Sequence, residues 1–200
     1  MKTKGQKLAD KISYILNPDI LIPVVMVIGF WYSNITLVNK IYAIVGIFFF
    51  NYIILLYWRG LLLKIGIVID DKLSNRRVQR IRVVALMPEF LIYLAETLLI
   101  AELGAKQPLF AIMISLIILA VVSGIISIFW KISAHAEGYT FMVAILGFLF
   151  SPVYWFLMAG IPLVWWARLK LERHTPTQLA MGTLFPPIIA FLVFQYFGLL

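Results

Sequence analysis

Two histidines, each in a short polar stretch, are the residues of this sequence best suited to chemistry. His135 lies in the stretch WKISAHAEG and His174 in the stretch WWARLKLERHTPTQ, and each stretch interrupts long apolar runs. Arg168 precedes His174 in the second stretch, and a guanidinium offers phosphate oxygens a fixed fork of donors. An imidazole can attack phosphorus as a nucleophile or move a proton near neutral pH. The two stretches therefore indicate transfer of a phosphoryl group.

The start of a helix is predicted at Ser133 and Ala134, just before His135. Backbone N–H groups at a helix start bind anions, and the small side chain of Ala134 lets a phosphate approach. His135 is then placed to protonate a leaving oxygen as a general acid. In the other stretch, Gln178 follows His174 by about one helical turn. Its amide oxygen is expected to accept a hydrogen bond from the His174 ring and to orient it.

The chemistry predicted for this site uses no metal ion and no cofactor. The chain contains four aspartates, and none of them forms a DxxxD or DxxD pair near either polar stretch. It contains no cysteine, which excludes a disulfide framework and thiolate chemistry.

The composition is that of an integral membrane protein. The chain is 63% hydrophobic and 13% charged, and its mean hydropathy is +0.99. Soluble domains are about 45–50% apolar and about 25% charged. In such a chain the net charge of +8 indicates the positive-inside bias of membrane proteins or a site for a phosphate-bearing lipid, and not nucleic-acid binding.

The apolar runs predict an all-α polytopic membrane protein with about six to seven transmembrane helices. Residues 1–18 form a basic amphipathic segment, and residues 19–200 form a single membrane domain. The run 139–166 is broken at Ser151-Pro152 and is long enough for two short helices. The other spans are predicted at roughly 18–33, 41–58, 83–101, 109–130 and 176–200.

Helix counting places the polar loop 66–82 and both histidine stretches on one membrane face, because two spans separate each from the next. Of the 17 lysines and arginines, all but Lys40 and Lys106 fall on that face. This bias predicts that the face is the cytoplasmic side of the cell (inner) membrane. The loop adds Lys72 and Arg80 as candidate phosphate ligands. Three further arginines of this segment are alternatives: Arg76, Arg77 and Arg82.

Two acidic residues lie within the third predicted span. Glu89 and Glu96 are seven positions apart and so share one helix face. An acid at the centre of a membrane costs about 2.5–3.5 kcal/mol, so it usually faces a partner or a cavity. We predict that both line the protein interior, with Glu89 closer to the basic face.

The polar segments resemble the three motifs of the type 2 phosphatidic acid phosphatase (PAP2) superfamily, which read K-x6-R-P, P-S-G-H and S-R-x5-H-x3-D. The second motif is similar to Ile132-Ser133-Ala134-His135, and the third to Ala167-Arg168-x5-His174-x3-Gln178. The first is similar to Lys72-x7-Arg80, which is one residue longer and lacks the proline. Gln178 stands where the family has aspartate, and Ala134 where it has glycine.

The resemblance implies a helical core like that of PAP2 enzymes and acid phosphatases. It implies hydrolysis of a lipid phosphate monoester or diphosphate, such as a prenyl diphosphate or phosphatidic acid, through a phosphohistidine. His174 is then the nucleophile and His135 the general acid. The phosphoryl oxygens are held by Lys72, Arg80, Ser133, the Ala134 N–H and Arg168.

The implied partners are the lipid substrate, with isoprenoid phosphates slightly preferred, and the surrounding membrane lipids. Two alternatives stay open. One is a lipid phosphotransferase of the same fold, and the other is a catalytically weak lipid-binding protein in which glutamine at 178 has silenced the site.

Overall fold

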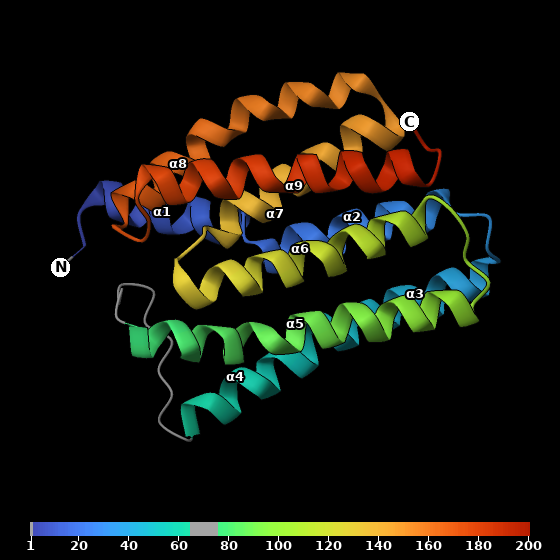
Figure 1. Ribbon diagram of the computed structural model, residues 1–200, viewed down its shortest axis with the longest axis horizontal. Helices are drawn as coiled ribbons and strands as arrows, with labels where there is room; N and C mark the ends of the chain where they lie inside the picture. The colour runs from blue at the N-terminus through green and yellow to red at the C-terminus, as the bar shows by residue number, and fades with distance from the viewer. Residues whose placement is uncertain (1, 65–75) are drawn as a thin grey trace. The chain divides into compact units, whose positions relative to one another are not determined.

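The computed structural model describes residues 2–64 and 76–200 and, within these ranges, the side chains other than those of 59, 63 and 76–86. All regular structure in these ranges is helical (Figure 1), which confirms the all-α fold class. The α-helices are α1 (Lys4–Ile15), α2 (Pro18–Tyr32), α3 (Leu37–Phe48), α4 (Leu55–Lys64), α5 (Arg76–Glu102), α6 (Leu109–Phe129), α7 (Ala134–Ile145), α8 (Ile161–Lys170) and α9 (Pro176–Tyr196). Three further helical segments lie between α-helices. The segments η1 (Phe49–Ile54) and η2 (Leu146–Phe150) are π-helices, and η3 (Pro152–Gly160) is a 3-10 helix.

Four helical segments in the described residues are long and apolar enough to cross a membrane. They are Lys4–Tyr32, Leu37–Leu62, Leu109–Phe129 and Pro176–Tyr196. The segment Ala134–Phe150 is apolar but shorter. These helices are compatible with a membrane protein, and the count of six to seven spans stays a prediction.

Two helix boundaries lie where the sequence indicates them. Helix α2 begins at Pro18, after Asn17, whose side-chain oxygen accepts the Asp19 N–H at 3.3 Å. A capping side chain followed by proline in the first turn is a favourable helix start. The long apolar run of the C-terminal half is interrupted at Ser151, which has extended backbone angles, and a new helical segment begins at Pro152.

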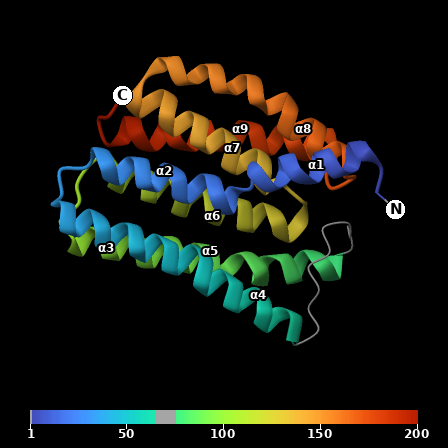
Figure 2. The same ribbon diagram turned by 180° about the vertical axis from the view of Figure 1, so that it is seen from behind.

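The chain divides into two compact units, Met1–Ile22 with Lys131–Leu200, and Pro23–Trp130. In the first unit, α1 packs along α8 and α7 packs along α9 (Figures 1 and 2). A core of Leu21, Tyr139, Val143 and Val164 fills the space among its helices. Both histidine stretches belong to this unit, so one packed body carries them.

In the second unit, the π-helix η1 separates α3 from α4 and carries a buried asparagine. A π-turn leaves a backbone carbonyl without its usual α-helical partner. The Asn51 side-chain N–H₂ donates to the Ile47 carbonyl at 3.0 Å and to Glu96 Oε1 at 2.5 Å. Glu96 is fully buried in this unit, which is the interior position expected for it, and Glu89 is half-buried.

Replacing Asn51 with alanine is expected to destabilise the second unit. The Ile47 carbonyl and Glu96 Oε1 would both lose a donor in a buried place, and each unsatisfied group costs about 1–3 kcal/mol. Thermal unfolding in detergent is expected to show a clearly lowered midpoint. Asn39→Ala is the matched control, because the Asn39 amide donates to the Leu103 carbonyl at a half-buried position. Equal shifts for the two variants would contradict the role given to Asn51.

Candidate functional site

Helix α8 ends in a Schellman turn, and this turn positions His174. The Arg173 N–H donates to the Arg168 carbonyl at 3.0 Å, and the Glu172 N–H donates to the Leu169 carbonyl at 2.9 Å. Glu172 has φ 54°, the left-handed conformation that such a turn requires and that glycine usually supplies. The turn reverses the chain, so His174 returns to the side chain of Arg168. The spacing between the arginine and the histidine is therefore a property of how the helix ends.

Arg168 and His174 are in direct contact. Arg168 Nη2 lies 3.4 Å from His174 Nε2, and the arginine side chain is only 6% exposed. A guanidinium nitrogen can only donate, so Nε2 of His174 is the acceptor and carries the lone pair. The ring proton is then on Nδ1. This nitrogen is buried and has no hydrogen-bond partner among the residues that the structure describes.

The surroundings of His174 keep its ring neutral. Burial is the main cause, and the nearby charges of Lys131 and Arg168 add to it, so that the pKa of His174 is lowered from 6.5 to about 2. His135 contributes a smaller effect in the same direction, and the Gln178 side chain offsets part of the lowering. At neutral pH the Nε2 lone pair is therefore available to attack an electrophile.

The start of α7 holds the second histidine. Ser133 is the N-cap, and its hydroxyl accepts the Ala136 N–H at 3.4 Å. This bond gives the Ser133 hydroxyl a structural use, and its contact with a phosphate stays a prediction. Ala134 is exposed at the first helical position. His135 follows it and donates from Nε2 to the backbone carbonyl of Ser13 at 3.1 Å.

Lys131 joins the two histidine stretches. Its ammonium donates to the Arg173 carbonyl at 2.7 Å, so the segment before α7 is fastened to the turn after α8. The charges of Lys131 and His135 both act on His174. The structure thus brings His135, Arg168 and His174 into one cluster.

Gln178 has a local role besides the orientation of His174, which stays a prediction. Its side-chain amide oxygen accepts the Thr175 backbone N–H at 3.1 Å, and the Gln178 backbone N–H donates to the Thr175 hydroxyl at 3.4 Å. This reciprocal pair is a capping box at the start of α9. The amide oxygen is thus engaged by the backbone, although the side chain lies near enough to His174 to act on it.

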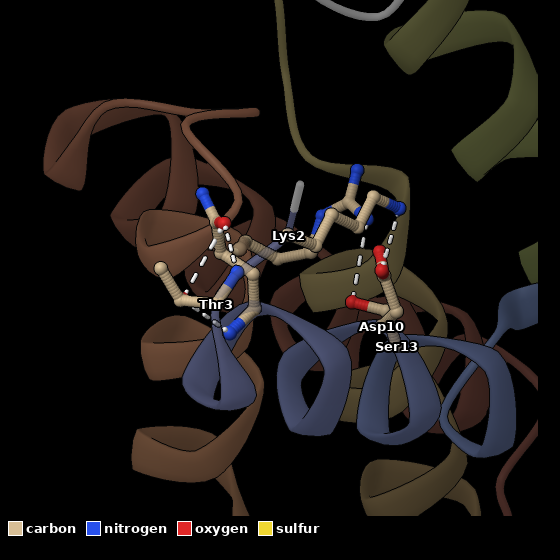
Figure 3. Close-up of polar contacts among 6 residues, drawn as sticks. Lys2, Thr3, Asp10 and Ser13 are labelled. Carbon is tan, nitrogen blue, oxygen red and sulfur yellow. Dashed lines mark hydrogen bonds and ion pairs between the residues drawn. The ribbon is translucent and has the colours of Figure 1, made fainter.

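Ser13 is a site residue that the sequence analysis missed. Its hydroxyl accepts a hydrogen bond from Arg168 Nη1 at 3.4 Å, and its carbonyl accepts from His135. Figure 3 shows Ser13 and Asp10 on α1, each making a polar contact. A signal was available, because Gly5, Ala9 and Ser13 place small residues along one face of α1, where another helix can approach closely.

Two of the predicted phosphate ligands fall on positions for which the structure describes no side chain. Lys72 lies outside the described residues, and the side chain of Arg80 is not among those described. Glu89 and Glu96 belong to the other compact unit. The described residues include no group of three or more histidines and acids that could hold a metal ion, and metal-free chemistry stays a prediction.

The arrangement combines a neutral imidazole, a buried guanidinium, a second imidazole and an ammonium. Such a set can bind an anion and attack an electrophilic phosphorus at its centre. No protein-family model, no curated protein and no solved structure matches the chain.

Proposed function

We propose that this chain is an integral membrane enzyme that removes a phosphate group from a lipid phosphate monoester or diphosphate. The observation that carries the proposal is the contact between Arg168 and His174, in which a buried cation lies 3.4 Å from a neutral imidazole nitrogen. The cation attracts phosphoryl oxygens, while the nitrogen keeps the lone pair that an attack on phosphorus needs.

In the proposed reaction, His174 Nε2 forms a bond to phosphorus as the bond from phosphorus to the lipid oxygen breaks. His135 gives a proton to the leaving oxygen. Water then attacks phosphorus, its proton passes to His135, and the nitrogen–phosphorus bond breaks. Inorganic phosphate leaves, and both histidines regain their starting states. Arg168 donates N–H groups to the phosphoryl oxygens in both steps.

Three further features support a lipid substrate. The chain is rich in apolar helices, the charge bias favours a site on the cytoplasmic face, and the polar segments resemble the PAP2 motifs. With six to seven spans around a PAP2-like core, a lipid tail would enter between helices while its phosphate reaches the polar end of α8. Isoprenoid phosphates and phosphatidic acid are the substrates to test first.

The direct test is phosphate release by the purified protein in detergent. Prenyl diphosphate, prenyl phosphate and phosphatidic acid are the substrates, and a phosphoenzyme is trapped by rapid denaturation in base, in which phosphohistidine survives. Release of phosphate together with a base-stable, acid-labile phosphoprotein is the expected result. Release without such an intermediate would exclude the histidine route. An added alcohol that becomes phosphorylated would instead identify a phosphotransferase.

Lipid-phosphate binding without turnover is a second candidate, and one observation favours it. The side chain that acts on the His174 ring as a hydrogen-bond partner is the neutral amide of Gln178, whereas a carboxylate there would stabilise the positive charge of a phosphohistidine. Retention of a lipid phosphate by a protein that releases no phosphate is the result that this candidate predicts.

Replacing Gln178 with aspartate is expected to raise the rate of phosphate release by about 10-fold or more. The carboxylate would accept a hydrogen bond from the His174 Nδ1–H and stabilise the charged intermediate, as a carboxylate partner does for catalytic imidazoles in general. Gln178→Glu is the control that keeps the longer side chain of the capping box. Initial rates at saturating substrate give the comparison, and a Gln178→Asp rate at or below the wild-type rate would refute the argument.

A further inference from the structure

The last turn of α1 touches two of the three residues to which we assign chemistry. Ser13 presents its hydroxyl to Arg168 Nη1 at 3.4 Å and its carbonyl to His135 Nε2 at 3.1 Å. One residue therefore links the phosphate-binding arginine to the second histidine. Ser13 is itself only 8% exposed, so this link lies inside the packed unit.

The contact with His135 has an electrostatic consequence. Carbonyls in the last turn of a helix lack partners within the helix, and that end carries partial negative charge. The last turn of α1 contains no basic residue of its own, and His135 and Arg168 meet it from other elements. A carbonyl only accepts, so Nε2 of His135 bears its proton there. The end of α1 that carries partial negative charge therefore contacts the ring to which the proposed mechanism assigns the role of general acid.

The two histidines of this cluster differ in their nearest polar contacts. His174 is next to Arg168 and Lys131, which disfavour a positive ring. His135 is held at the negative end of α1. The proposed mechanism gives the two rings different tasks, nucleophile for His174 and general acid for His135.

Helix α1 is fixed in place by contacts that do not involve the site. Ala9 is fully buried, and Gly5 lies close enough to α8 that an added Cβ would be 3.1 Å from Lys170 Cε. The N-terminus of α1 is capped by a capping box between Thr3 and Gln6. These contacts fix the position of α1 along and around its own axis. Ser13 therefore keeps one position, from which it can orient Arg168 and His135.

We propose that Ser13 is a positioning residue, which holds the Arg168 guanidinium and the His135 ring in the orientation that a phosphate group requires. The inference rests on the proposed function. The hydroxyl acts through Arg168, so its loss affects phosphate binding. The carbonyl acts through His135, so displacement of α1 affects proton transfer to the leaving group.

The experiment compares Ser13→Ala, Ser13→Thr and Ala9→Leu with the wild-type protein. Ser13→Ala is expected to raise the KM for lipid phosphate and the inhibition constant for orthovanadate about 10-fold, with kcat changed less than about 3-fold. Ser13→Thr keeps the hydroxyl and is expected to restore both constants. Ala9→Leu overfills the contact of α1 and is expected to lower kcat as well.

The choice of substrate separates the effect of the Ser13 hydroxyl on Arg168 from the effect of the Ser13 carbonyl on His135. An aryl phosphate has a leaving group that departs without a proton, so its kcat is expected to withstand Ala9→Leu better than the kcat of a lipid phosphate. Ser115→Ala is the matched control. It removes a hydroxyl that is also buried, from α6, where it bonds the Ala111 carbonyl at 2.8 Å. Both constants are expected to be unchanged in the control.

Two results would overturn the inference. Kinetic constants unaltered by Ser13→Ala would show that the hydroxyl does not act through Arg168. Faster turnover in Ser13→Ala or Ala9→Leu would show that α1 obstructs the site instead of ordering it. If the wild-type protein releases no phosphate, the proposed function fails, and orthovanadate binding then decides the inference. Weaker binding to Ser13→Ala supports it, and equal or undetectable binding refutes it.

Discussion

Replacing His174 with alanine is expected to lower phosphate release from lipid phosphates by about 10³-fold or more, because no nitrogen–phosphorus bond can then form. The trapped phosphoprotein is expected to disappear in the same variant. Initial rates in detergent and base-quenched phosphoprotein measure the two effects. Equal rates for the variant and the wild-type protein would remove His174 from the mechanism.

His135→Ala is the matched control for this prediction, since it removes the other ring of the same site. It is expected to slow the release from lipid phosphates by about 10²–10⁴-fold, the usual range for a general acid. The leaving group of an aryl phosphate needs no proton. His135→Ala is therefore expected to release phosphate from an aryl phosphate at close to the wild-type rate. His174→Ala is expected to be inactive toward both substrates. A reversed pattern would exchange the roles of the two histidines.

His174 also supplies a test that needs no substrate. The pKa of its ring is about 2 in the folded chain, against 6.5 ordinarily. Below about pH 6.5 the His174 ring binds a proton in the unfolded chain but not in the folded chain. The free energy of unfolding therefore falls as the pH is lowered toward 2. His174→Ala removes this difference. Its unfolding midpoint is therefore expected to fall less on acidification than that of the wild-type protein.

Replacing Gly182 with alanine is expected to lower both stability and activity. Helix α9 crosses the start of α7 at this glycine, where an added Cβ would lie 2.8 Å from the Ser133 carbonyl and 3.2 Å from Ala136 Cβ. The nearer atom belongs to the backbone that caps the helix of His135, so α7 must shift. Overpacking of this kind costs about 1–3 kcal/mol, and a displacement of about 1 Å at a reacting group lowers rates by about 10²-fold.

Gly124→Ala is the control for the glycine substitution. Gly124 lies in α6, and an added Cβ there meets no atom within 4 Å. Alanine is favoured over glycine in a helix by about 0.5–1 kcal/mol, so this variant is expected to be unchanged or slightly stabilised. Thermal unfolding and phosphate release are measured on both proteins. Similar results for the two would mean that α9 accommodates the methyl group without moving α7.

The meeting of the two histidine stretches was predictable because it depends on coarse properties of the chain. The apolar runs predicted two spans between the two stretches, and an even number of spans returns the chain to the same face. The count of spans itself stays a prediction. Arg168, His135 and His174 are rare polar residues in such segments, so their types indicated the chemistry that we propose. The contact of Lys131 with the Arg173 carbonyl depends on backbone geometry and could not be read in this way.

Ser13 escaped prediction for a physical reason. The lysines of α1 dominate its pattern and indicate a solvated or membrane-surface helix, whereas its small residues occupy the opposite face and pack along α8. The partner of Glu96 escaped for another reason. An acid in an apolar run implies a partner, but Asn51 reaches it from a π-helix, and nothing in the pattern of apolar residues marks a π-turn. The capping box at the start of α9 was also missed, although the spacing Thr175-x-x-Gln178 signals it.

The Schellman turn after α8 fixes the number of residues that can separate Arg168 from His174. Surface loops ordinarily accept insertions and deletions, but one residue more or fewer here would rotate His174 away from the guanidinium. Glu172 is exposed, so its charge is free to vary in evolution while the left-handed backbone is not. Glycine and asparagine are the expected replacements at 172 among relatives, and β-branched residues should be absent from that position.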